Sequence, residues 1–158
     1  MPDLVVTNAI DTFMGSADQA AMRTNLGGIT GPDLATNPRT RTITLGVRVN
    51  AGVVPTGPIL ANAPLSVTGT ITGWKMVCTP AATVTVDLWK KNADPPADAN
   101  SIVDGGGTLP AIVAGKYATD GVAGWNHLAV AAGDIIEANV DANDLAQQIA
   151  ITLTMLED

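Results

Sequence analysis

The chain has 158 residues, of which 46% are hydrophobic, 15% charged and 3% aromatic, and its net charge is −7. This length suits one ordinary domain with an appendage, and its core must be built from Val, Ile, Leu and Ala. The acidic balance and the scattered arginines argue against nucleic-acid binding, because phosphate would repel such a surface. The low charge fraction favours a chain whose surface is partly buried by neighbouring subunits.

The sequence also predicts a chain that is made in a cytoplasm and does not insert into a membrane. Residues 1–13 lack the positive region and the apolar core of a secretory signal. No apolar run is long enough to span a bilayer. The single cysteine, Cys78, excludes an internal disulfide, and its apolar surroundings favour a buried, unreactive thiol.

Residues 1–36 predict two short helices and a linker. The helices are expected over 8–14 and 16–26, where Ser16 can cap the second and Gly27 can end it. Helices of this length are marginal in isolation, so their apolar sides must dock onto the body of the chain or onto a partner. The docking side chains are expected to be Ile10, Phe13, Met14, Met22 and Leu26.

From Thr40 onward the hydrophobic period changes to two, which is typical of strands. The run at 92–110 has Pro-Pro and triple Gly and is expected to be irregular, and 111–124 is ambiguous. Seven or eight short strands predict a mainly β fold, an antiparallel, jelly-roll-like β-sandwich over 37–158. The expected strands are 40–49, 59–66, 70–78, 83–90, 125–130, 135–140 and 148–156.

Trp89 lies on the polar side of its predicted strand. Side chains alternate along a strand, so Val84, Val86 and Leu88 share one face, while Trp89 shares the other with Thr85 and Asp87. In a lone sandwich this ring would meet water. We therefore expect a second copy of the chain to cover Trp89, Asp87 and Thr85 at a subunit interface. Trp74 and Trp125 are expected in the core, and the alternative for all three tryptophans is stacking on sugar rings.

The sequence predicts no enzyme, cofactor or metal site. The lone His127 is expected to be structural, since no spacing supports a pair with Cys78 and no nucleophile or zinc motif occurs. Turn carboxylates offer calcium ligands, but their spacing does not match a calcium-binding loop, and solvated turn acids are expected. The acids concerned are Asp94, Asp98, Asp104, Asp134, Asp141 and Asp144.

Two parts of the chain resemble bacteriophage proteins. The segment VVTNAIDTFMGSADQAAMRTNLGG, residues 5–28, resembles a short helical motif of phage tail-fibre proteins. The later order resembles the β-sandwich head of phage fibre and receptor-binding proteins. Its marks are ITGW at 71–74, VDLWK at 86–90, a Pro-rich loop, Trp125, AGD at 132–134 and IAITLT at 149–154.

The resemblance implies a virion structural protein, a subunit of a short fibre or spike. Proteins of this kind are typically homotrimers whose N-terminal part is fixed to other virion proteins and whose β-rich part faces outward. This chain has no shaft between the two parts. A host cell-surface glycan or protein would then be bound by loops, with Asp94, Asp98, Asn100, Tyr117 and Asp120 as candidate contacts. The alternatives are a capsid, head or collar decoration protein without receptor binding, and a carbohydrate-binding β-sandwich module.

Overall fold

The computed structural model describes residues 39–61, 64–92 and 94–158. The expected helices with their docking residues Ile10, Phe13, Met14, Met22 and Leu26, the linker and the boundary at residue 36 lie outside the described residues. They stay predictions.

The described chain is mainly β, as predicted. Its strands are β1 (Thr40–Arg48), β2 (Gly57–Ala61), β3 (Gly69–Asn92), β4 (Ala111–Asp120), β5 (Ala129–Val130), β6 (Asp134–Asn143) and β7 (Gln148–Glu157), and a short 3-10 helix, η1, spans Asp98–Asn100. The stretch at 111–124 that the sequence left ambiguous is a strand, β4, over its first ten residues. The strand expected over 125–130 is wrong for most of its length, because only its last two residues pair. Within the described ranges no helix is long and apolar enough to cross a membrane.

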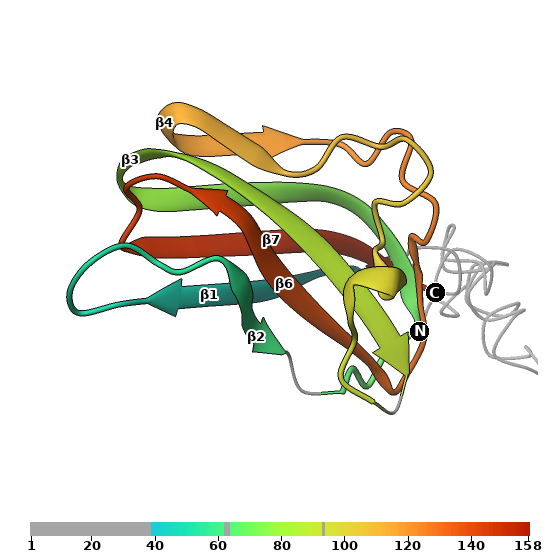
Figure 1. Ribbon diagram of the computed structural model, residues 1–158. Coiled ribbons are helices and arrows are strands. Elements are labelled where there is room, and N and C mark those ends of the chain that lie inside the picture. The colour runs from blue at the N-terminus through green and yellow to red at the C-terminus, as the bar shows by residue number, and fades with distance from the viewer. Residues whose placement is uncertain (1–38, 62–63, 93) are drawn as a thin grey trace, which may run out of the picture. The chain divides into compact units, whose positions relative to one another are not determined.

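The strands form one antiparallel sheet in the order β1-β7-β3-β6-β2, with β4 and β5 also paired to β3 (Figure 1). The centre of this sheet is β3, which changes partner halfway along. Its residues 69–79 pair with β7, and its residues 84–92 pair with β6. β4 follows β3 past the change of partner, with register shifts between Val77 and Val84. The sequence predicts a break between strands at 70–78 and 83–90, and this is wrong, because β3 continues through Pro80 and only changes its partner there.

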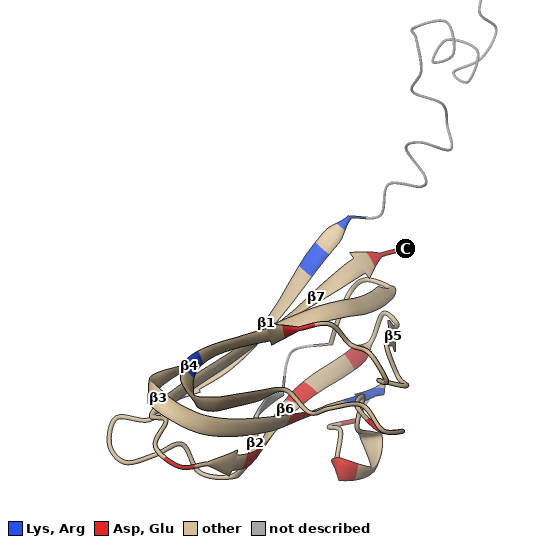
Figure 2. Ribbon diagram, turned by 90° about the horizontal axis from the view of Figure 1, so that it is seen from above, with Lys and Arg blue, Asp and Glu red and all other residues tan. Residues whose placement is uncertain are grey.

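The sheet curls so that the half containing β1 and β7 faces the half containing β2 and β6 (Figure 2). Inward side chains of both halves form a single apolar cluster, which includes Leu45, Met76, Val86, Leu88, Ile136, Val140, Ile151 and Leu153. Trp74 and Trp125 belong to this cluster, as predicted. The indole of Trp125 donates to the carbonyl oxygen of Thr108 at 3.1 Å, which satisfies its one polar atom.

Candidate binding surface

The outer side of residues 84–92 of β3 is covered by the segment 94–110, called the cover loop below. Ile102 donates its backbone N–H to the carbonyl of Leu88 at 2.7 Å, and Trp89 forms an isolated β-bridge with Ser101. The carboxylate of Asp87 accepts three further hydrogen bonds: from the Leu88 N–H at 2.7 Å, the Trp89 indole at 2.8 Å and the Ser101 hydroxyl at 2.8 Å. The loop is therefore bound to the strand by both backbone and side-chain contacts.

The expectation that Trp89 would meet water in a lone chain is wrong. Its exposed fraction is 8% and that of Asp87 is 7%, because the chain's own loop lies over them. Thr85 is half-buried and pairs with Ala111 on β4 and Ala142 on β6. The alternation rule placed the ring on the correct face, but it could not reveal that a distant loop returns to that face. Exposure of Trp89 therefore no longer supports an oligomer interface at Thr85, Asp87 and Trp89, and that interface stays a prediction.

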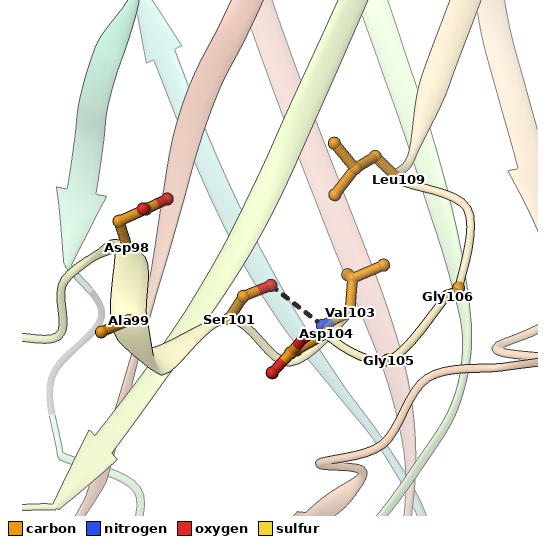
Figure 3. Close-up of a pocket in the computed structure, with 9 residues that line it drawn as sticks. Asp98, Ala99, Ser101, Val103, Asp104, Gly105, Gly106 and Leu109 are labelled. Atoms are coloured by element: carbon orange, nitrogen blue, oxygen red, sulfur yellow. Dashed lines mark hydrogen bonds between the residues drawn. The ribbon is translucent and has the colours of Figure 1, made fainter.

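The cover loop lines a hollow of about 410 Å³ that is open to solvent. Its wall runs from η1 at one end to three consecutive glycines at the other, and the Ser101 hydroxyl accepts the Val103 N–H at 3.2 Å beneath it (Figure 3). The carboxylates of Asp98 and Asp104 are exposed at the hollow. The full lining is Asp98, Ala99, Ser101, Val103, Asp104, Gly105, Gly106, Gly107 and Leu109. The surface thus combines acceptor oxygens, backbone groups and a small apolar area.

Two features of the glycine run explain its sequence. Gly105 and Gly106 have φ of +97° and +106°, a region in which a side chain is strained. At Gly107 an added Cβ would lie 2.5 Å from Cδ1 of Trp125. The missing side chain therefore lets the loop pass directly over the indole.

A smaller hollow of about 170 Å³ shares Ala99 and Ser101 with the large one and also involves Lys90, Asn100 and His127. The Lys90 ammonium donates to the carbonyl oxygens of His127, at 3.0 Å, and Ala129. Burial lowers the pKa of Lys90, and nearby Asp134 partly opposes this. The ammonium therefore holds the 127–129 segment against β3 and has its hydrogen bonds within the chain.

The tryptophans do not present faces for sugar stacking. A third hollow of about 130 Å³ is lined by Trp74, Trp125, Thr108, Asp120, Gly121 and Ala123. The two indoles are 7% and 6% exposed, so they have too little accessible surface for a sugar ring to stack on. Trp89 is covered as well, so all three tryptophans are buried, Trp74 and Trp125 in the core and Trp89 beneath the cover loop.

The predicted receptor contacts fall into separate places. Asp98 lines the large hollow, and Asn100 lines the smaller one while its side-chain oxygen accepts the Ala97 N–H at 3.1 Å. Asp94 is exposed and pairs with Lys91 at 3.4 Å. Tyr117 lies on β4 opposite Val77, away from the cover loop, and Asp120 accepts the Gly121 N–H at 2.7 Å in the tryptophan hollow.

The hollow also contains residues that the sequence did not indicate as receptor contacts, namely Ser101, Val103, Asp104, Leu109 and the three glycines. The Gly105–Gly107 run was a usable signal for a sharply folded loop. The position of Ser101 against Asp87 was not, because it depends on a contact between residues 14 apart in an irregular segment.

Three of the residues considered for catalysis or for calcium binding, Cys78, Asp134 and Asp144, form hydrogen bonds that stabilise the fold. The Cys78 thiol donates to the carbonyls of Pro80 and Gly115 at 3.4 and 3.3 Å, and burial raises its pKa. Asp144 accepts the Thr83 N–H at 2.8 Å. Asp134 is buried and not solvated as expected, since it accepts the Ala131 N–H at 2.9 Å and a weak bond from Asn92 at 3.4 Å. Among the residues that the structure describes, no three His, Cys, Asp or Glu side chains are grouped to hold a metal ion.

Comparison with known proteins gives no family assignment. No family model matches the chain, and no curated protein matches it. Among solved structures, a chain described as "Structure of infectious bursal disease virus Gx strain" is similar at 11% identity and a TM-score of 0.25. The similarity covers 78% of this chain and 37% of the viral chain. At that TM-score it carries no argument about fold or function.

Proposed function

We propose that the chain is a virion structural protein, a subunit of a short trimeric phage fibre or spike that contacts the host surface. In this proposal the curled sheet is a jelly-roll-like β-sandwich head over 37–158, and residues 1–36 dock onto other virion proteins. Support comes from the sequence resemblance along most of the chain and from the mainly β fold. The mature protein resides in the virion after synthesis in the bacterial cytoplasm.

The cover loop with its open hollow is the observation that carries the host-contact part of this proposal. Binding surfaces are commonly built from loops on a rigid scaffold, and this loop is fixed to β3 through Asp87 and Ile102. The exposed carboxylates of Asp98 and Asp104, with backbone groups and Leu109 beside them, suit hydroxyl and amino groups such as those of a cell-surface glycan. Contact of this kind needs no catalysis, and three copies would add weak contacts through a high effective concentration.

Labelling of particles tests the proposal. An antibody raised against residues 39–158 is applied to phage particles from the lysate in which the chain is made, and bound antibody is located by electron microscopy. Labelling at the tail tip or on a fibre is the expected result. Labelling confined to the capsid or collar would replace host contact with a decoration role. Unlabelled particles alongside free soluble protein would overturn the virion assignment.

A further inference from the structure

The two hollows at the cover loop differ in their hydrogen-bonding character. The large hollow presents the exposed carboxylates of Asp98 and Asp104, which only accept hydrogen bonds when they are ionised. The smaller hollow lies directly beside it, because Ala99 and Ser101 line both. The side chains that complete the smaller hollow are those of Lys90, Asn100 and His127. All three carry N–H donors, so acceptors on one side of Ser101 are followed by donors on the other.

The side-chain amide of Asn100 has a defined orientation. Its Oδ1 accepts the backbone N–H of Ala97 at 3.1 Å. Because that N–H can only donate, the amide oxygen must face Ala97, and the NH2 group is directed elsewhere. Asn100 is half-buried where it lines the smaller hollow. The fold therefore holds an N–H donor in a fixed position there.

Positive charge adds to this donor. The Lys90 ammonium gives two of its three N–H groups to the carbonyl oxygens of His127 and Ala129, and these neutral oxygens fix the ammonium without cancelling its charge. Asp134 also acts on the ammonium, but its carboxylate is buried and accepts the Ala131 N–H. The exposed imidazole of His127 offers a further N–H. Donors of this kind suit an anionic group such as a phosphate or a carboxylate.

We propose that the two hollows together bind one amphoteric sugar unit, with its amino group in the large hollow and its phosphate or carboxylate group in the smaller one. The proposal rests on host contact through the cover loop and names the chemical class of the ligand. A purely anionic sugar would be repelled by the two carboxylates and by a chain of net charge −7. A purely cationic sugar would leave the donors of the smaller hollow without an acceptor.

The spacing of the two hollows fits a single sugar unit. Asp98 and Asn100 are two residues apart on η1, which is about 4 Å along the axis at the usual rise of a 3-10 helix. Side chains that start from these positions can reach substituents on opposite sides of one six-membered ring. Ser101, which both hollows share, is held by the Asp87 carboxylate at 2.8 Å, so the two hollows keep their relative position.

Ligand-observed NMR titration of the full chain with matched sugars tests the proposal. Glucosamine 6-phosphate carries both charges, glucosamine has the amino group alone, and glucose 6-phosphate has the phosphate alone. We expect glucosamine 6-phosphate to bind at least ~10-fold more tightly than either single-charge sugar, which is the gain typical of an added hydrogen bond to a charged group. Muramic acid, an amino sugar with a carboxylate, is compared with it to show which anionic group the smaller hollow prefers.

A nearly isosteric variant links the preference to the smaller hollow. Asn100→Asp keeps the oxygen that accepts the Ala97 N–H but replaces the NH2 donor with a negative charge. It should bind glucosamine 6-phosphate at least ~10-fold more weakly and bind glucosamine no less tightly than the unchanged chain. Asn50→Asp is the matched control, because it makes the same change at an exposed residue outside both linings. Near-UV circular dichroism checks that both variants keep native tryptophan packing.

Each outcome decides the proposal. A preference for an amphoteric sugar that Asn100→Asp abolishes and Asn50→Asp retains supports it. Equal binding of all the sugars, binding of none of them, or a preference that survives Asn100→Asp overturns it, and host contact through another ligand then still stands. Antibody labelling confined to the capsid or collar would instead overturn host contact, whatever the sugars do.

Discussion

The indole Nε1 of Trp89 donates its hydrogen to Oδ2 of Asp87 at 2.8 Å, and the two side chains lie on the same side of β3. This pair explains how a large aromatic ring is accommodated on the outer side of a strand. The carboxylate satisfies the indole N–H, and its other oxygen binds Ser101, which brings the cover loop over the ring. One carboxylate therefore makes both the local hydrogen bond to Trp89 and the long-range hydrogen bond to Ser101.

Replacing Asp87 with Ala should weaken the whole domain. The change leaves the Trp89 indole and the Ser101 hydroxyl without their acceptor, and each buried unpaired group costs roughly 1–3 kcal/mol. We expect a lower free energy of unfolding in urea, followed by tryptophan fluorescence. Asp94→Ala is the control, because its exposed ion pair with Lys91 contributes about 1 kcal/mol at most. Equal midpoints for the two variants would show that the network does not hold the loop.

Reversing the charge of the large hollow should reduce the ability of the added chain to compete with phage for binding to host cells. The full chain, added in excess, is expected to slow phage adsorption if the cover loop contacts the host surface. Asp98→Lys/Asp104→Lys changes both carboxylates of the hollow, so this variant should compete at least ~10-fold less well, equivalent to about 1.4 kcal/mol of binding. Asp94→Lys alters a neighbouring exposed acid outside the lining and should compete normally. Equal competition by both variants would exclude the hollow as the contact.

Replacing Asp141 with Asn should stabilise the folded chain at neutral pH but not at low pH. Asp141 is exposed but partly desolvated, and this desolvation, with the charges of Asp87 and Asp98 nearby, raises its pKa, while a hydrogen bond from Asn139 acts in the opposite direction. In the window between the usual and the raised pKa the folded chain binds more protons than the unfolded chain, so stability falls as pH rises through this window. Asp141→Asn removes that loss and should raise the melting temperature at pH 7. The difference should vanish below the ordinary Asp pKa of about 3.9, as measured by calorimetry at both pH values. A gain that is equal at both pH values would contradict the assignment.

Gly107→Ala should disturb the contact between the cover loop and the core. Its added methyl would overlap Trp125, and such overpacking costs typically about 1–3 kcal/mol. A shift in Trp125 fluorescence and faster amide exchange in the cover loop should accompany the lower stability. Gly121→Ala is the matched control, since its added Cβ would meet nothing within 4 Å. A Gly107→Ala chain as stable as the control would mean that the loop can move aside without cost.

The sequence was most informative where a strand has one buried face. Period-two alternation identified the strands at 83–90 and 148–156 because every second side chain in them enters the core. β4 could not be identified in this way, because Ala114 has a positive φ and the register shifts as the strand follows the bend of β3. Alternation is lost where a strand bends.

The candidate surface was predictable only in part. The position of the loop and the inclusion of Asp98 followed from Pro-Pro and Gly-rich composition, which marks an irregular segment. The covering of Trp89 did not follow, because Ser101 has no sequence feature that distinguishes it from any other loop serine. Tyr117 was assigned to a loop, but it lies within β4 opposite Val77 of β3 and does not line the hollow.

The continuity of β3 has a consequence for how the domain loses its structure. One uninterrupted strand, β3, supplies hydrogen bonds to β7 along 69–79 and to β6 along 84–92. Both halves of the sheet therefore depend on the same strand. If either half unfolded, the other half would lose the support of β3, and the apolar core that both halves share would be exposed to water. The domain should therefore denature in a single cooperative step, with the slowest-exchanging amides along β3 itself.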